Sequence, residues 1–281
     1  MTCAEGPIAT VVLVGGHESS CGTALPALTA HAGPAMVTPV GGPLQHVVTR
    51  LLDASAGPVV VVPMTFGRDR RMVADTANTL RWLSIDDAPR VALAQPFGTI
   101  DHLTGWLRRA ATQIRDATPD AAVLLTADAS DPFDDAELYR IAHLVRTFGA
   151  GNEIDVGIVD NRGRTPAIQR LQRLGFDDIV MVPAGFNRHL GAGWLVDGTP
   201  QVRFHGPIMS DGAVADVVRQ RLDAALHKLA HGDTGIAAGL DADHGNGYAH
   251  SHGTGEAADR HEHHEHHEHQ EHHDNSFIDA H

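Results

Sequence analysis

Two histidines and two aspartates occupy matching places in two halves of this 281-residue chain, with their order exchanged. Asp69 and His189 each follow, by six residues, a proline that ends an apolar run. Upstream, another apolar run leads into His17 in the first half and into Asp128 in the second. Imidazole and carboxylate groups together suit Zn²⁺, Co²⁺, Ni²⁺ or Fe²⁺, and both accept protons near neutral pH. The pattern therefore predicts a metal or proton-transfer site made of these four residues.

The apolar runs predict the strands that would position these groups. Val59–Pro63 and Ile179–Pro183 are short, lack polar alternation, and are separated from the next run by a helical pattern. Such runs are typical of strands buried on both faces of a parallel sheet. Ligands bind beyond the carboxyl ends of such strands, so we expect one cleft between two half-sheets to hold all four residues. Asp69 and Asp128 could instead be helix N-caps, since each precedes a helical pattern.

The repeat divides the chain into three parts. Residues 1–118 and 119–231 each alternate strand-like runs with helical patterns. This predicts an α/β fold of two tandem, parallel, four-stranded, doubly wound lobes related by a pseudo-twofold. Residues 232–281 lose the apolar periodicity and are rich in Gly, His, Asp and Glu. Because such a segment buries too little apolar surface to fold alone, we expect a disordered tail.

The tail holds the densest set of metal-ligating side chains in the sequence. Twelve of the 21 histidines lie at or beyond His244, interleaved with glutamates. Many nitrogen and oxygen ligands on one segment indicate metal buffering or delivery. A pH-responsive solubilising tail or an engineered appendage is the alternative. The histidines expected to bind metal are His261, His263, His264, His266, His267, His269, His272 and His273.

Arginines flank the expected cleft residues. Arg68 and Arg71 lie beside Asp69, and Arg188 precedes His189. Guanidinium groups bind carboxylates through charge-assisted hydrogen bonds, so these three are candidates for binding a polycarboxylate substrate. Each could instead be a solvated charge at the start of a helix.

Composition excludes several classes of function. The formal charge is −14, but residues 232–281 contain eleven Asp and Glu against one Arg, which leaves −4 for the rest. No basic stripe typical of a nucleic-acid binder is present. Only Cys3 and Cys21 occur, which gives no disulfide framework. The run Ile8–Val14 is too short for a signal peptide or a membrane helix. We therefore expect a cytoplasmic protein with no nucleic-acid or membrane partner.

The sequence resembles the class II chelatases of tetrapyrrole biosynthesis, specifically the CbiX-type sirohydrochlorin chelatases. The matching segments are Val11–Ser19 with His17 at the strand end, Val59–Asp69 with its proline, and the stretches around Pro96 and Pro207. The resemblance covers about residues 8–230. Glu18 replaces a glycine of the family pattern, and Asp69 stands where the family has its second histidine.

The resemblance implies insertion of a divalent metal ion into sirohydrochlorin during cobalamin biosynthesis. Co²⁺ is the preferred metal substrate, with Ni²⁺ or Fe²⁺ as alternatives. His17 and His189 would bind metal or accept the pyrrole protons, Asp69 and Asp128 would lower the cost of bringing in a dication, and the arginines would orient the substrate's carboxylates. A monomer with two fused lobes would suffice. The alternative function is a non-catalytic protein that stores or delivers Ni, Co or Zn.

Overall fold

The computed structural model describes residues 9–25, 35–87, 90–159, 166–189 and 202–243. The first half of the chain forms a four-stranded, all-parallel sheet with the order β2-β1-β3-β4. Its strands are β1 (Thr10–Gly15), β2 (Ala35–Pro39), β3 (Val59–Met64) and β4 (Val91–Leu93). All six residues of β3 are buried, as expected for the unbroken apolar run in a parallel sheet.

The second half repeats this arrangement. A second all-parallel sheet has the order β6-β5-β7-β8, which is the same strand order counted from its own first strand. Its strands are β5 (Ala122–Asp128), β6 (Ile154–Val159), β7 (Ile179–Pro183) and β8 (Val202–Phe204). β3 and β7, which carry the repeated prolines, occupy equivalent positions. The predicted fold class, two parallel four-stranded α/β lobes, is confirmed.

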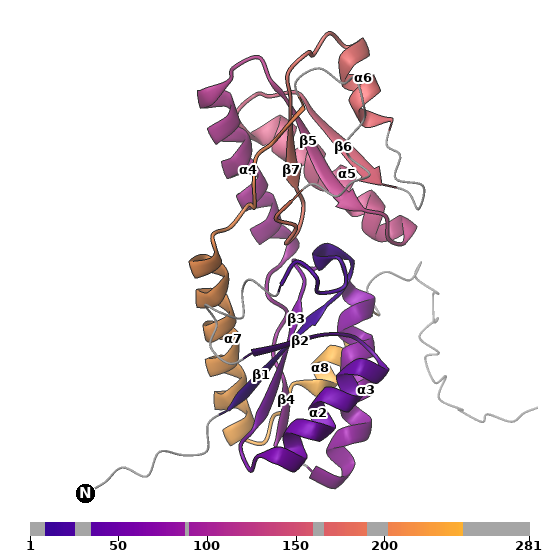
Figure 1. Ribbon diagram of the computed structural model, residues 1–281, viewed down its shortest axis with the longest axis vertical. Helices are drawn as coiled ribbons and strands as arrows, with labels where there is room; N and C mark the ends of the chain where they lie inside the picture. Colours follow the sequence, from indigo (N-terminus) through magenta and orange to yellow (C-terminus); the bar gives the residue numbers. More distant parts are fainter. Residues whose placement is uncertain (1–8, 26–34, 88–89, 160–165, 190–201, 244–281) are drawn as a thin grey trace, which may run out of the picture. The chain divides into compact units, whose positions relative to one another are not determined.

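Helices connect the strands in both sheets (Figure 1). Amphipathic patterning places their apolar faces against the strands; in α2, for example, Leu44, Val48 and Leu52 are buried. None of the described helices combines the length and apolar character needed to cross a bilayer. The helices that follow strands within one lobe are α2 (Gly42–Ala54), α3 (Arg70–Asp87), α5 (Pro132–Phe148) and α6 (Ala167–Arg173).

The last helix of each half packs on the lobe of the other half. α4 (Ile100–Ala117) follows β4 but packs against α5 and β7. α7 (Asp211–Ala230) follows β8 but packs against β3 and β4, and Figure 1 shows it beside the first sheet. The two lobes therefore do not coincide with the segments 1–118 and 119–231 that the repeat suggested, because each lobe takes its closing helix from the other segment.

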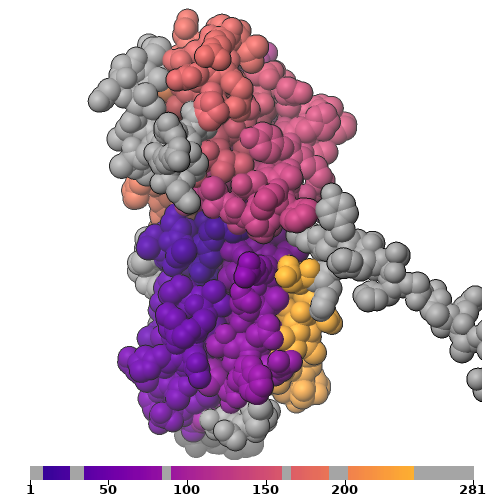
Figure 2. Space-filling view, turned by 90° about the vertical axis from the view of Figure 1, so that its right-hand side faces the viewer, coloured from indigo at the N-terminus to yellow at the C-terminus, as the bar shows by residue number. Residues whose placement is uncertain are grey.

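The folded part continues beyond residue 231, where we expected the tail to begin. A short helix α8 (Ile236–Leu240) packs against α3, and a 3₁₀ turn follows at Asp241–Asp243. Ile236 is buried in the core of the first lobe, and Leu93 of β4 donates its N–H to the Thr234 carbonyl at 2.8 Å. Figure 2 shows this C-terminal segment, in yellow, covering part of the surface beside the first half of the chain. Residues 244–281, and the tail histidines in them, lie outside the described part.

An aromatic cluster joins the two lobes. Phe66 stacks on Phe186 of the second half, with ring centroids 4.9 Å apart, and Phe97 meets both rings edge-on at 5.2 and 5.0 Å. Phe66 and Phe97 are almost completely buried. These rings belong to one continuous core that includes residues of both sheets, so the lobes share hydrophobic stabilisation.

Replacing Phe66 by Ala should lower the free energy of unfolding by about 3–5 kcal/mol, the usual cost of removing a buried aromatic ring. Urea unfolding followed by circular dichroism measures this. Phe148 is 60% exposed, so Phe148→Ala is the matched control and should change stability by less than about 0.5 kcal/mol. Similar stabilities for the two variants would contradict the shared core.

Candidate functional site

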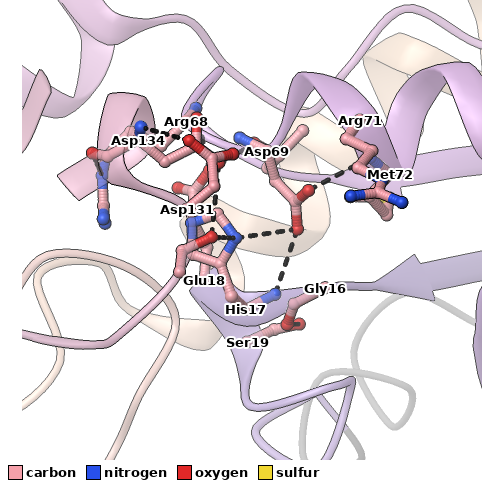
Figure 3. A network of polar contacts seen from close by, with 12 residues as sticks. Gly16, His17, Glu18, Ser19, Arg68, Asp69, Arg71, Met72, Asp131 and Asp134 are labelled. Carbon is pink, nitrogen blue, oxygen red and sulfur yellow. Dashed lines mark hydrogen bonds and ion pairs between the residues drawn. The ribbon is translucent and has the colours of Figure 1, made fainter. Parts of the chain in front are cut away.

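His17 lies in a 3₁₀ turn, His17–Ser19, directly after β1. Gly16 before it allows a carboxylate to approach closely, because a Cβ at that position would meet Asp69 Oδ2 at 1.9 Å. The imidazole is mostly buried, with 14% of the side chain exposed. Figure 3 shows this ring among carboxylates from two different segments.

Asp69 follows β3 and uses its two oxygens for different partners. Oδ1 accepts the N–H of Met72 at 3.1 Å and thereby caps the start of α3. Oδ2 accepts the backbone N–H of His17 at 3.0 Å and lies 3.1 Å from its Nδ1. The N-cap interpretation and the site interpretation of Asp69 therefore hold together. The hydrogen bond that caps α3 fixes the position of the Asp69 carboxylate, and this carboxylate in turn orients the imidazole of His17.

The second half of the chain completes the site with Ser130 and Asp134. Ser130 Oγ lies 3.0 Å from His17 Nδ1 and donates to Asp134 Oδ2 at 3.3 Å. Asp134 is in the first turn of α5 and is 5% exposed. One potential ligand atom from each of His17, Asp69 and Asp134 lies within 4.8 Å of the others. Among the described residues this is the one group of three or more His, Cys, Asp or Glu side chains so arranged.

The environment changes the pKa of each of these three groups. Burial would lower the pKa of His17, but the hydrogen bond and the charge of Asp69 outweigh it and raise that pKa. Burial opposes ionisation of Asp69, yet its contacts with His17 hold its pKa below the ordinary value. Burial, together with a hydrogen bond and the charge of Asp131, raises the pKa of Asp134 to about 7. The cluster therefore takes up and releases protons near neutrality.

The arrangement around the imidazole does not suit a serine nucleophile. Ser130 Oγ and Asp69 Oδ2 both face Nδ1, whereas a Ser-His-Asp triad needs the hydroxyl and the carboxylate on opposite ring nitrogens. The other nitrogen of His17, Nε2, is buried and has no hydrogen-bond partner among the described residues. Buried polar atoms are rarely left unpaired, so this nitrogen indicates a ligand that the protein itself does not provide. One imidazole and two carboxylates are ligand types that divalent transition-metal ions bind.

Glu18 holds the loop that carries Asp69. Its buried carboxylate accepts the hydroxyl of Thr65, the N–H of Phe66 at 3.0 Å and the N–H of Arg68 at 3.0 Å. Burial raises the pKa of Glu18, and the nearby Arg68 charge opposes that rise. The Glu18 carbonyl in turn accepts the N–H of Phe186 at 2.8 Å. One residue thus ties the loop of the first lobe to the second lobe.

Strand register separates Asp128 from the cluster. Val14 pairs with Pro63 and Thr126 pairs with Pro183. Counting on from these pairs, the residue equivalent to His17 is Ala129. Asp128 corresponds to Gly16, one position earlier than the sequence pattern suggested. Its carboxylate accepts a hydrogen bond from Ser20 at 3.0 Å, and it is not in the group of His17, Asp69 and Asp134.

The other residues predicted for the site are not members of the group of His17, Asp69 and Asp134. His189 is exposed after β7 and is not in the group either. Arg68 is 1% exposed and donates to the carbonyls of Asp134 at 3.4 Å and Ala184 at 3.3 Å, so its guanidinium joins the lobes. Arg71 is 79% exposed, and Arg188 pairs with Asp211 at 2.5 Å. Of the four residues first predicted, the structure brings together His17 and Asp69.

Sequence reasoning missed Ser130 and Asp134 as members of the site. The acidic start of α5 fits the ordinary preference for acids in a first helical turn, which hid the role of Asp134. Asp131, three residues earlier, is the actual N-cap and accepts the N–H groups of Phe133 and Asp134. Three acids at the start of α5, Asp131, Asp134 and Asp135, where one suffices as a cap, were the available signal.

Comparison with solved structures finds two proteins that are similar to parts of this chain. One is a multi-domain protein of Deinococcus radiodurans, described as structurally similar to chelatases and as having two additional novel domains. It aligns with 22% identity and a TM-score of 0.44, over 77% of this chain and 55% of its own, so this chain spans about half its length. The other is the periplasmic sugar-binding protein of an ABC sugar transporter from Legionella pneumophila, with 9% identity and a TM-score of 0.34, over 62% of this chain and 70% of its own. No protein-family profile and no curated protein matches the sequence.

Fold and site together define a two-lobed α/β protein with a buried His/Asp cluster formed by both halves of the chain. The likeness to solved structures is too distant to assign a function. The proposed function therefore rests on the residues of the site and on the resemblance of the sequence to chelatases.

The raised pKa of Asp134 predicts a pH-dependent stability. The pKa of Asp134 is about 7 in the folded protein, against an ordinary value of 3.8. The protonated form of Asp134 therefore stabilises the fold fully below about pH 4, and this stabilisation is lost as pH rises through about 7. Asp134→Asn, which cannot ionise, should therefore be more stable than wild type at pH 8, with the difference shrinking toward pH 4. Urea unfolding in metal-free buffer measures this. The exposed Asp53→Asn is the control, and parallel pH profiles for wild type and Asp134→Asn would contradict the assignment.

Proposed function

We propose that this protein inserts a divalent metal ion into a tetrapyrrole, and that His17, Asp69 and Asp134 hold the ion before transfer. The cluster of these three side chains carries the proposal, since it combines one nitrogen and two oxygen ligands within 4.8 Å of one another. Mixed nitrogen and oxygen ligands fit Co²⁺, Ni²⁺, Fe²⁺ and Zn²⁺. The resemblance to CbiX-type chelatases makes sirohydrochlorin and Co²⁺ the preferred substrates, with Ni²⁺ or Fe²⁺ behind.

Metal insertion also needs a proton acceptor, and the same cluster provides one. Two pyrrole N–H protons must leave the macrocycle as the metal enters. His17 has a raised pKa and Asp134 a pKa of about 7, which are suitable values for groups that exchange protons at neutral pH. Asp69 stabilises the protonated imidazole through its 3.1 Å contact with Nδ1.

Substrate carboxylates need cations that water can reach. Arg71, at 79% side-chain exposure, and Arg188, at 22%, are the predicted arginines that meet this condition. Arg68 is buried against backbone carbonyls, so we assign it to positioning the site. His189 and Asp128 would act at the edge of the site, where the macrocycle approaches.

Metal storage or delivery is the second candidate function. The side chains of His17 and Asp69 are 14% and 10% exposed, and ligands this enclosed favour retaining an ion over exchanging it with a large macrocycle. A His-rich tail would serve the same purpose. The two functions differ in turnover: a chelatase converts tetrapyrrole repeatedly, while a storage protein binds ions without changing one.

His17→Ala should reduce the rate of metal insertion about 100-fold, because it removes both a ligand and a general base. The assay follows the absorption spectrum of sirohydrochlorin with Co²⁺, Ni²⁺ or Fe²⁺. Asp69→Asn and Asp134→Asn should reduce the rate as well, and the exposed His46→Ala should not.

His189→Ala in the same assay should cause a smaller loss than His17→Ala, because His189 lies outside the cluster. Wild type that binds Co²⁺ without any spectral change in the tetrapyrrole would favour storage. Normal turnover by His17→Ala would exclude the proposed site under either function.

The tail should matter only when metal is scarce. A tethered set of histidines raises the local metal concentration, and this advantage disappears once free metal is abundant. A chain ending at Asp243, which keeps α8, should therefore be slower than the full chain at low metal and equal to it at high metal.

The amount of metal bound by the tail histidines should also decrease below about pH 6, because histidine must be neutral to bind metal. Rates measured across a metal titration at two pH values test both statements. Equal rates at every metal concentration would remove the delivery role, and a shortened chain that stays inactive in excess metal would place the tail in the catalytic step.

A further inference from the structure

A hollow lies in the first lobe, apart from the His17 cluster. It has a volume of about 360 Å³ and is bounded by the end of β4, the last turns of α7, and α8. The apolar side chains lining it include Leu93, Pro96, Ala225 and Ala238. A neighbouring hollow of about 330 Å³ shares the lining residues Val73, Pro96 and Ala242.

The walls of this hollow are built from small side chains. Ala224 and Ala225 of α7 face Ala238 of α8 and Ala242 of the turn that follows it. Ala224 and Ala238 are exposed and Ala225 is buried, so the hollow is open to solvent on one side, and leucine at these positions would fill part of its space. The volume is within the range of small-molecule sites. The hollow also lies just beyond the carboxyl end of β4, where parallel sheets bind ligands.

The charges at its edge are positive. Arg221 and Lys228 line the hollow, and none of its lining residues is acidic. Arg221 is held in place because its Nε and Nη2 donate to the Phe97 carbonyl at 3.3 and 3.2 Å. Lys228 forms a long ion pair with Asp233, at 3.8 Å, and its side chain is 46% exposed. An apolar chamber with two cations at its rim suits a ligand with an apolar body and one anionic end.

We propose that this hollow binds a small apolar carboxylate, such as a medium-chain fatty acid. The apolar body lies among the alanines, and the carboxylate meets Lys228 and Arg221. The neighbouring hollow is lined by residues that include Gly67, Arg70 and Asp101. Gly67 and Arg70 lie on either side of Arg68 and Asp69 in the chain, so a ligand that extends into this hollow contacts the loop bearing Asp69.

Isothermal titration of the full-length protein with sodium decanoate tests the site. Ala238→Leu fills the hollow and should weaken decanoate binding at least about tenfold, by overpacking the space the ligand needs. Ala237→Leu adds the same side chain to the same helix at a position that does not line the hollow, and should bind as wild type does. If Ala238→Leu does not fold, Ala224→Leu serves in its place. No decanoate binding to wild type, or equal binding to the filled variant, would overturn the proposal.

A charge variant tests the orientation of the ligand. Lys228→Gln should weaken decanoate about fivefold, the upper range for a solvent-exposed ion pair, and leave 1-decanol binding unchanged. His227→Gln, on the neighbouring position that does not line the hollow, is the control. Equal losses for decanoate and decanol would show that the carboxylate does not meet Lys228 and would overturn the assignment of an anionic ligand.

Discussion

The buried carboxylate of Glu18 fixes the geometry on which the site depends. A carboxylate inside a protein is costly unless hydrogen bonds and an opposite charge compensate its lost hydration. Here the Thr65 hydroxyl, two backbone N–H groups and the nearby Arg68 supply that compensation. Because these donors belong to residues 65–68, the loop before Asp69 has one favourable conformation. This loop conformation holds the Asp69 carboxylate beside His17.

The same residue, through its backbone carbonyl, also connects the two lobes. Phe186 of the second half donates its N–H to the Glu18 carbonyl, and Gly185 makes that approach possible, since a Cβ there would lie 2.4 Å from the carbonyl oxygen. Arg68, in the first half, also links the lobes, because its guanidinium donates to two backbone carbonyls of the second half. The exchanged helices α4 and α7 add further packing across the halves. A site that uses ligands from both halves therefore rests on a shared core as well as on polar contacts.

Much of the fold was accessible from sequence because short apolar runs report buried parallel strands directly. The pairing of His17 with Asp69 followed from the same logic, since both stand just past strand ends. Asp128 illustrates the limit: the apolar runs align the two halves to within about one residue, and the pairing of Thr126 with Pro183 fixes the register. Asp134 and Ser130 depend on how α5 of one half meets the turn of the other, a long-range contact that local patterns do not encode. The exchange of α4 and α7 was hidden for the same reason, because a helix has the same sequence pattern whichever sheet it covers.

The protonation of the cluster constrains the order of events in the proposed reaction. The hydrogen bond and charge of Asp69 favour the protonated imidazole of His17, and Asp134 has a pKa of about 7, so in the proposed reaction a dication that binds these groups displaces protons from them. The groups that hold the metal are then unable to accept protons from the macrocycle. The imidazole and carboxylates can accept protons again only as the ion moves to the pyrrole nitrogens. In the proposed reaction, metal transfer to the macrocycle and proton uptake by the protein therefore occur together. A single histidine with two carboxylates is enough for that exchange, because each proton that leaves the macrocycle replaces charge that the departing ion removes from the protein.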